Sequence, residues 1–177
     1  KMQHLLLSPR FRERPIKWHI ETNGTISPHH LLEHFECITV SPKLTSAQNP
    51  EPKNALERKP VFVREKFDEW VQYARARPNA YFKFVMGESD WSVLDEVLDM
   101  IPRASNGVSG SRRSSILGWP SRENRRQSRR PVEIHLQPQT YEDEHYANFG
   151  DKILEQLNQG WPGREDIVVR YMPRFHD

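Results

Sequence analysis

Five short runs of apolar or alternating residues, separated by segments with helical spacing, constrain the fold of this chain more than any other feature. Each run is five or six residues long and rich in β-branched or aromatic side chains, which is typical of strands. We expect strands over residues 16–20, 37–41, 81–86, 132–137 and 167–172. Because strands and helices alternate along the chain, the pattern predicts an α/β fold with a mostly parallel sheet and crossover helices.

Five helices are expected around these strands, over residues 3–12, 28–35, 65–77, 90–101 and 142–158. For the second helix, Ser27 supplies an N-cap oxygen and Pro28 takes the first helical position. For the last helix, Thr140 and Asp143 have the spacing of a capping box. Gly160 should end that helix, because glycine readily adopts the conformation found just after a helix.

The composition fits one domain over residues 1–177, since 36% of the residues are apolar and 28% are charged. Residues 44–59 contain prolines and many polar side chains and are expected to form a loop. Residues 104–130 are rich in arginine and serine and predict a flexible insertion, because they bury too little apolar surface to offset the entropy of ordering. The stretch 103–130 carries eight arginines against Glu123 alone.

Two simple counts exclude several classes of protein. No apolar run approaches the roughly 18 residues that span a bilayer, and the first residues lack the apolar region of a secretory signal. We therefore expect a cytoplasmic protein without membrane association. Cys37 is the single cysteine, which excludes an internal disulfide and any iron–sulfur cluster that takes several ligands from this chain.

Polar side chains gather at the ends of the predicted strands and near the end of the chain. They include Glu21, Thr22, Asn23, Ser41, Lys43, Gln137 and His176. The carboxyl ends of parallel strands share one edge of a sheet, where α/β proteins bind their ligands. A carboxylate, hydroxyls, an ammonium, amides and an imidazole around one mouth suit a polar, zwitterionic ligand with an amino acid end and a ring end.

Five motifs at these positions resemble, in the same order, those of a known family. They are ETNGT at 21–25, VSPK at 40–43, KFV at 83–85, LQP at 136–138 and MPRFH at 172–176. The family comprises the radical S-adenosylmethionine enzymes that make 7-carboxy-7-deazaguanine for queuosine and related deazapurines. The resemblance covers essentially the whole chain except the arginine-rich insertion.

The resemblance implies a partial (β/α) barrel, incomplete at its N-terminal side. It also implies a carbon–nitrogen lyase that converts 6-carboxy-tetrahydropterin to 7-carboxy-7-deazaguanine with loss of ammonia. The implied cofactors are S-adenosylmethionine, a [4Fe–4S] cluster and Mg²⁺, and the implied partners are a flavodoxin-like reductant and a second copy of the chain. By resemblance, the cofactor-binding residues are Asn23, Ser41, Lys43 and Gln137, and the substrate-binding residues are Glu21, Thr22 and His176.

The chain lacks the family's N-terminal loop with three cysteines and the GGEP strand that follows it. The segment at 1–6 is similar to the helix after that strand, so we expect the later part of a longer enzyme or a split relative. No residue of this chain is assigned as a cluster ligand. The alternative is a non-catalytic module that binds a ligand, or nucleic acid, without a cluster of its own.

Two further interpretations stay open. His30, Glu33 and His34 form an H-x-x-E-H string, the signature of inverted zinc proteases, in which both histidines must share one face of a helix. The simpler interpretation is a short helix whose leucines are buried and whose histidines are exposed. The arginine-rich stretch 103–130 could bind nucleic-acid phosphates, with Trp119 stacked on a base, or could be a solvated insertion without a ligand.

Overall fold

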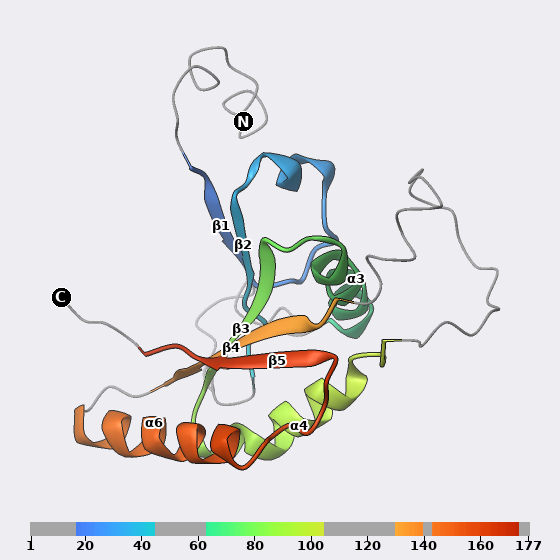
Figure 1. Ribbon diagram of the computed structural model, residues 1–177. Helices are drawn as coiled ribbons and strands as arrows, with labels where there is room; N and C mark the ends of the chain where they lie inside the picture. Colours follow the sequence, from blue (N-terminus) through green and yellow to red (C-terminus); the bar gives the residue numbers. More distant parts are fainter. Residues whose placement is uncertain (1–16, 45–62, 105–129, 140–142, 174–177) are drawn as a thin grey trace.

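The computed structural model of the protein describes residues 17–44, 63–104, 130–139 and 143–173 (Figure 1). The strands are β1 (His19–Thr22), β2 (Cys37–Val40), β3 (Ala80–Met86), β4 (Val132–Pro138) and β5 (Ile167–Tyr171). The helices are α3 (Arg64–Ala76), α4 (Trp91–Met100) and α6 (Asp143–Asn158), with short 3₁₀ helices η1 (His30–His34) and η3 (Glu88–Asp90). None of the helices in these ranges combines the length and the apolar character needed to cross a membrane.

The five strands form one sheet in which all neighbouring strands are parallel and the strand order follows the sequence, β1-β2-β3-β4-β5. This result confirms the predicted α/β fold with a parallel sheet and crossover helices. Within the described residues, β1 and β5 are the two edges and do not pair with each other. The sheet is therefore open, and the barrel that the resemblance implies is not formed by these residues.

All five predicted strands are present, with ends displaced by at most three residues. Helices α3, α4 and α6 occupy three of the predicted helical segments. The turn after α6 contains Gly160 with a φ of +87°, as expected for a residue that ends a helix. The predicted helix at 3–12, the Thr140 cap, most of the loop at 44–59 and nearly all of the insertion at 104–130 lie outside the described residues.

The predicted second helix is wrong in its type and its start. It is the 3₁₀ helix η1, which follows the cap residue His29. Nδ1 of His29 accepts a hydrogen bond from the backbone N–H of Leu31 at 3.3 Å. The hydroxyl of Ser27 instead accepts a hydrogen bond from Nζ of Lys66 at 2.9 Å. Ser27 thus connects this loop to α3, and the cap position of η1 is two residues later, at His29.

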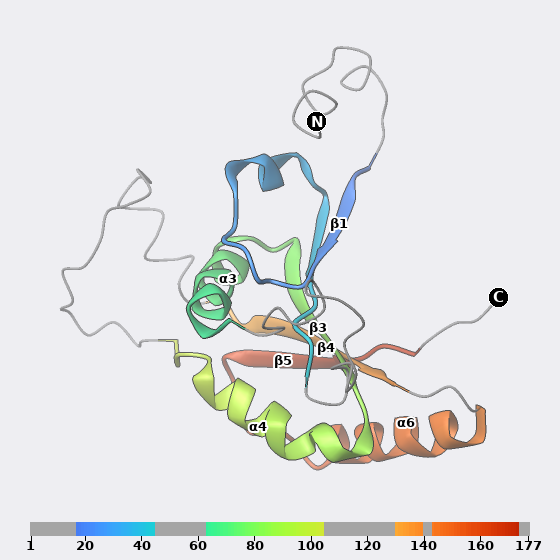
Figure 2. The same cartoon turned by 180° about the vertical axis from the view of Figure 1, so that it is seen from behind.

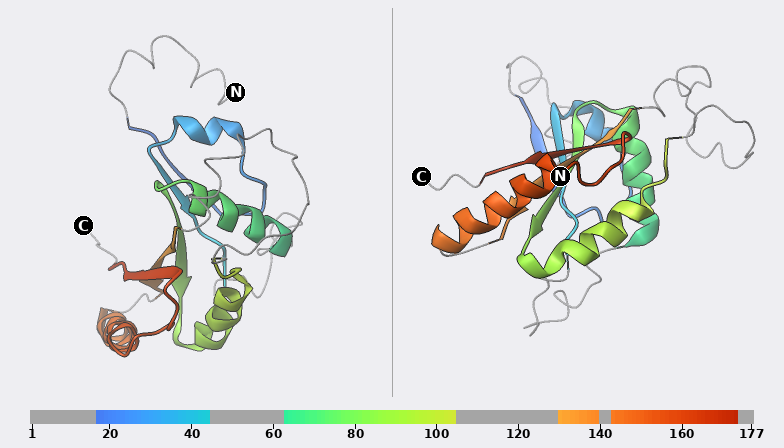
Figure 3. Two further views of the ribbon diagram at one scale, coloured as in Figure 1. Left: turned by 45° about the vertical axis from the view of Figure 1, so that its right-hand side comes forward. Right: turned by 60° about the horizontal axis from the view of Figure 1, so that its bottom comes forward.

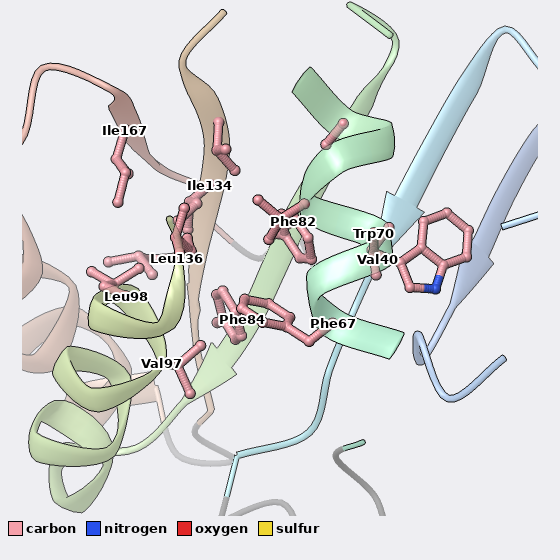
Figure 4. Close-up of a cluster of buried hydrophobic side chains, with 14 of the residues drawn as sticks. Val40, Phe67, Trp70, Phe82, Phe84, Val97, Leu98, Ile134, Leu136 and Ile167 are labelled. Carbon is pink, nitrogen blue, oxygen red and sulfur yellow. The ribbon is translucent and has the colours of Figure 1, made fainter. Parts of the chain in front are cut away.

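The core lies between the sheet and the helices, and its centre is one face of β3 and β4. Side chains alternate along both strands, and those with even numbers are buried. Phe82 and Phe84 are 0% exposed, and burial of a phenylalanine stabilises a fold by about 1.5–3 kcal/mol. Figure 4 shows them beside Phe67 of α3 and Val97 of α4. The buried residues of α3 have helical spacing, since they are Phe67, Trp70, Val71, Ala74 and Arg75.

The three long helices pack on the same face of the sheet. Helices α4 and α6 lie side by side beneath β4 and β5, and α3 lies beside β3 (Figures 1 and 2). Trp91 of α4 contacts Phe149 of α6, with ring centroids 6.3 Å apart. Successive parallel strands joined by crossovers of one hand place every helix on one side, because no reversal of strand order occurs. Figure 3 shows the resulting arrangement from two further directions.

A nearly buried ion network joins the elements near the start of β5. Asp166 accepts hydrogen bonds from Nη2 of Arg75 at 2.8 Å and from Nε and Nη2 of Arg164 at 3.0 and 2.8 Å. The backbone N–H of Ala104 also donates to it at 3.1 Å. Arg164 reaches two carbonyl groups at the end of α4. One carboxylate therefore connects α3, the end of α4 and the start of β5.

Candidate functional site

The candidate site is the face of the sheet on which α3, α4 and α6 do not pack. Strand alternation and register place one set of polar side chains there, which we call the polar face. It consists of Glu21, Thr39, Tyr81, Lys83, Glu133, His135, Gln137 and Arg170. Parallel sheets are ordinarily covered by apolar contacts on both faces, so a charged face indicates a binding surface.

An ion pair joins the first and third strands across the polar face. Nζ of Lys83 lies 2.7 Å from Oε1 of Glu21 and 2.8 Å from its Oε2. Because Glu21 is on β1 and Lys83 is on β3, the pair spans β2. The Lys83 side chain is 16% exposed and that of Glu21 is 51% exposed, so the carboxylate faces solvent while the ammonium is largely covered.

A stacked ring pair lies in the middle of the same face. The rings of Tyr81 on β3 and His135 on β4 have centroids 4.2 Å apart and planes inclined by 22°. Burial raises the pKa of Tyr81, so its hydroxyl stays protonated at neutral pH. Lys83 and His135 are direct partners in the register of β3 and β4. The stack and the ion pair are therefore adjacent parts of one surface.

Glu133 connects the stacked histidine to the edge strand β5. Its Oε1 lies 2.8 Å from Nε2 of His135 and 2.8 Å from Nε of Arg170. The hydrogen bond with His135 and the nearby Arg170 charge lower the pKa of Glu133, although burial opposes them. Glu133 is thus a carboxylate at neutral pH and accepts both hydrogen bonds.

Ser41 and Lys43 directly follow β2, at the carboxyl-terminal edge of the sheet. Ser41 is 1% exposed, and its hydroxyl has no hydrogen-bond partner among the described residues. Buried hydroxyl groups nearly always have a partner, so an unpaired one at a sheet edge indicates a place for a ligand atom. Lys43 is half-buried, and in the described part of the chain it forms no ion pair.

The other predicted residues at this edge differ in whether their side chains already form hydrogen bonds within the protein. Gln137 lies on the polar face in register with Val85, and two inter-strand spacings, or about 10 Å, separate β4 from β2. Asn23 is exposed, but its Oδ1 accepts hydrogen bonds from the backbone N–H and the hydroxyl of Thr25. Oγ1 of Thr22 accepts from the backbone N–H of Gly24 at 3.2 Å. Thr22 and Asn23 thus build the turn after β1, which is the simpler role for these residue types.

Gly24 is required in that turn for two reasons. Its φ is +74°, a conformation that other residues rarely adopt. A Cβ at this position would also lie 3.0 Å from Cγ1 of Val40. Asn23, Gly24, Pro42 and Trp70 line a shallow depression beside this turn that encloses no ligand-sized cavity.

Ser41 and Lys43 have groups that suit S-adenosylmethionine, whereas the chain lacks the thiolates that an iron–sulfur cluster needs. The free ammonium of Lys43 and the unpaired hydroxyl of Ser41 suit an α-amino carboxylate. A [4Fe–4S] cluster needs several thiolates, and the sequence has Cys37 alone, which lies in β2. No step that depends on a cluster can therefore be assigned to residues of this chain.

The H-x-x-E-H string does not have the geometry of a zinc site in this structure. In the 3₁₀ helix η1 three residues complete a turn, so His30 and His34 do not share a face as they would in an α-helix. Oε1 of Glu33 accepts a hydrogen bond from Arg77 at 3.1 Å. Within the described ranges, no three histidine, cysteine, aspartate or glutamate side chains are grouped so that they could hold a metal ion.

Some predicted residues are not placed, and some placed residues were not predicted. His176 and almost all of the stretch 103–130, including Trp119, lie outside the described residues. Sequence reasoning assigned no site role to Tyr81, Glu133, His135 or Arg170. The alternation in the VEIHLQP segment of β4 already places Glu133, His135 and Gln137 on one face, which was the available signal.

Comparison with known proteins assigns neither a family nor a function to the chain. No protein-family model, curated protein or solved structure matches the chain. The chemistry of the polar face and the sequence motifs are therefore the basis for a proposal about function.

Proposed function

We propose that this chain binds S-adenosylmethionine and 6-carboxy-tetrahydropterin at the polar face, as in a 7-carboxy-7-deazaguanine synthase. In this proposal the cluster ligands come from outside these 177 residues. The reaction converts the tetrahydropterin to the deazapurine with release of ammonia. The role of this chain is to bind and orient the cofactor and the substrate.

The observation that carries the proposal is the winding of the sheet together with the polar edge that it creates. Strand order β1-β2-β3-β4-β5 with helices on one face is the winding of a (β/α) barrel, in which the other face lines the interior. This face bears the Glu21–Lys83 pair and Gln137, and the β2 edge beside it bears Ser41 and Lys43. We infer that the open sheet is one part of such a barrel.

Each residue has a specific role in the proposal. Lys43 pairs with the carboxylate of S-adenosylmethionine, and the Ser41 hydroxyl hydrogen-bonds its polar end. Gln137, about 10 Å from β2, is at a distance suited to the adenosyl end. Glu21 accepts hydrogen bonds from the N–H groups of the pterin ring, and Lys83 holds the Glu21 carboxylate in place.

Calorimetric titration with S-adenosylmethionine tests the cofactor site. Lys43→Ala is expected to raise the dissociation constant by tenfold or more, because loss of a charge-assisted partner costs about 1.5–3 kcal/mol. Lys17→Ala is the matched control, since it also removes one cation, lies before β1 at the opposite edge, and is 75% exposed. An unchanged dissociation constant for Lys43→Ala would remove the role of Lys43.

Titration with pterin-6-carboxylate, which is fluorescent, tests the substrate site. Glu21→Gln keeps the size of the side chain but loses the charge, so it should weaken pterin binding more than S-adenosylmethionine binding. An equal loss of both affinities would indicate a change in folding. The circular dichroism spectrum of the variant then shows whether the fold has changed or only the binding of the pterin.

The second candidate function is a binding module without catalysis, and the single cysteine favours it. The intact mass of the natural gene product distinguishes the two candidates. A mass clearly above 21.0 kDa, with further cysteines, supports the enzyme. A mass of 21.0 kDa supports a binding role or a separate partner polypeptide that carries the cluster.

A further inference from the structure

The part of the polar face formed by Tyr81, Glu133, His135 and Arg170 has no role in the proposal above. It combines an imidazole, two charged groups and a stacked ring, which are polar groups that can bind a ligand. His135 is at its centre, because β3 and β5 place Lys83 and Arg170 on either side of it in register. Its side chain is 16% exposed, so the ring is held in place but can be reached.

The contacts of His135 determine which of its ring nitrogens carries the proton. Nε2 lies 2.8 Å from Oε1 of Glu133, and a carboxylate can only accept a hydrogen bond. Nε2 must therefore donate. In the neutral ring the proton is then on Nε2, and Nδ1 is an acceptor. In the described part of the chain, Nδ1 has no hydrogen-bond partner.

Charged groups flank the ring on both neighbouring strands. Lys83 on β3 and Arg170 on β5 are the register partners of His135, and both are cations. Glu133 pairs with Arg170 as well as with His135, and Glu21 pairs with Lys83. Tyr81 contributes a neutral ring that stacks on the imidazole.

We propose that Nδ1 of His135 accepts a hydrogen bond from an N–H group of the ligand, with Glu133 as the positioning residue that fixes the tautomer. The ligand class is a planar heterocycle with several N–H donors, because this face offers acceptors at Nδ1 of His135 and at the Glu21 carboxylate. This assignment rests on the proposed function, in which the amino-pyrimidinone edge of the pterin supplies the donors.

Two substitutions at position 135 separate the nitrogens. Asparagine reaches about as far from the backbone as Nδ1 does, so His135→Asn can keep an acceptor for the ligand. Glutamine reaches about as far as Nε2, so His135→Gln keeps a partner for Glu133 but loses the Nδ1 acceptor. We expect pterin-6-carboxylate affinity to fall about tenfold or more in His135→Gln and to stay within about threefold of the wild type in His135→Asn.

The tautomer is measured directly in the protein without ligand, by ¹⁵N–¹H correlation spectra of the imidazole at neutral pH. We expect the pattern of a ring protonated on Nε2, and we expect Glu133→Gln to weaken that preference and to lower pterin affinity. A ring protonated on Nδ1 would overturn the inference whether or not the pterin binds.

The pterin-binding measurements on the wild type and the two position-135 variants then separate this inference from the proposed function. If the wild type binds the pterin and both position-135 variants bind equally well, the role of His135 is wrong and the proposed function stands. If the wild type does not bind the pterin, the proposed function and the assigned ligand role of His135 both fail. The spectrum alone then decides whether the acceptor assignment of Nδ1 survives.

Discussion

Replacement of Asp166 by asparagine should destabilise the fold strongly, because it removes the shared counter-charge of two nearly buried arginines. The Asp166 carboxylate lies between the guanidinium groups of Arg75 and Arg164, whose side chains are 10% and 9% exposed. An asparagine side chain has nearly the same shape but no charge, and its amide N–H₂ would face arginine donors. Two nearly buried cations would then remain without a counter-charge.

The expected loss of unfolding free energy is about 3–5 kcal/mol, the range found when one partner of a buried ion pair is removed. Urea unfolding followed by tryptophan fluorescence is the assay. Glu36→Gln is the matched control, because Glu36 pairs with Lys17 at 2.8 Å where both side chains are well exposed, and it should cost less than about 1 kcal/mol.

The difference in unfolding free energy between the wild type and Asp166→Asn should also depend on pH, and it should shrink as the pH falls. Burial tends to raise the pKa of Asp166, but hydrogen bonds from Arg164 and Ala104 and the arginine charges lower it overall. A lowered pKa in the folded state gives stability above the unfolded pKa of about 3.9 that is lost as the pH falls through the lowered value. A loss as small as that of Glu36→Gln at pH 7 would contradict this account of Asp166.

Other substitutions test the core and the turn after β1. Phe84→Ala should cost about 3–5 kcal/mol of unfolding free energy, because Phe84 is 0% exposed, whereas Val168→Ala at a 36% exposed position should cost less than about 1 kcal/mol. Gly24→Ala should cost more than Gly160→Ala in the same urea assay. Both have positive φ, but a Cβ at Gly24 would lie 3.0 Å from Val40, while a Cβ at Gly160 would meet nothing within 4 Å. Equal costs for the two glycines would show that Val40 moves aside.

The strands were predictable because each carries its own signal. The alternation of buried and half-buried residues in β3 and β4 is a period of two that is visible in the sequence. Helices α3 and α4 were likewise predictable from apolar spacing. The second helix was not, because Ser27 and Pro28 form a locally plausible helix start, and only the distant Lys66 shows that Ser27 is used elsewhere.

The candidate site was predictable at the strand ends and unpredictable on the sheet face. Ser41, Lys43 and Gln137 could be singled out because polar residues directly after or at the end of parallel strands share one edge. The Glu21–Lys83 pair joins residues 62 positions apart, and its existence depends on β2 lying between their strands. No local pattern carries that information.

Local periodicity and crossover length are enough to predict that this chain alternates strands and helices and forms a parallel α/β sheet, because they leave few other arrangements. Only the folded chain shows that the sheet is open and that the helices share one face. The meeting of Tyr81, Glu133, His135 and Arg170 on the opposite face also emerges only there. The physical reason is register, since the pairing of distant strands sets which side chains become neighbours, and that pairing exists only after folding.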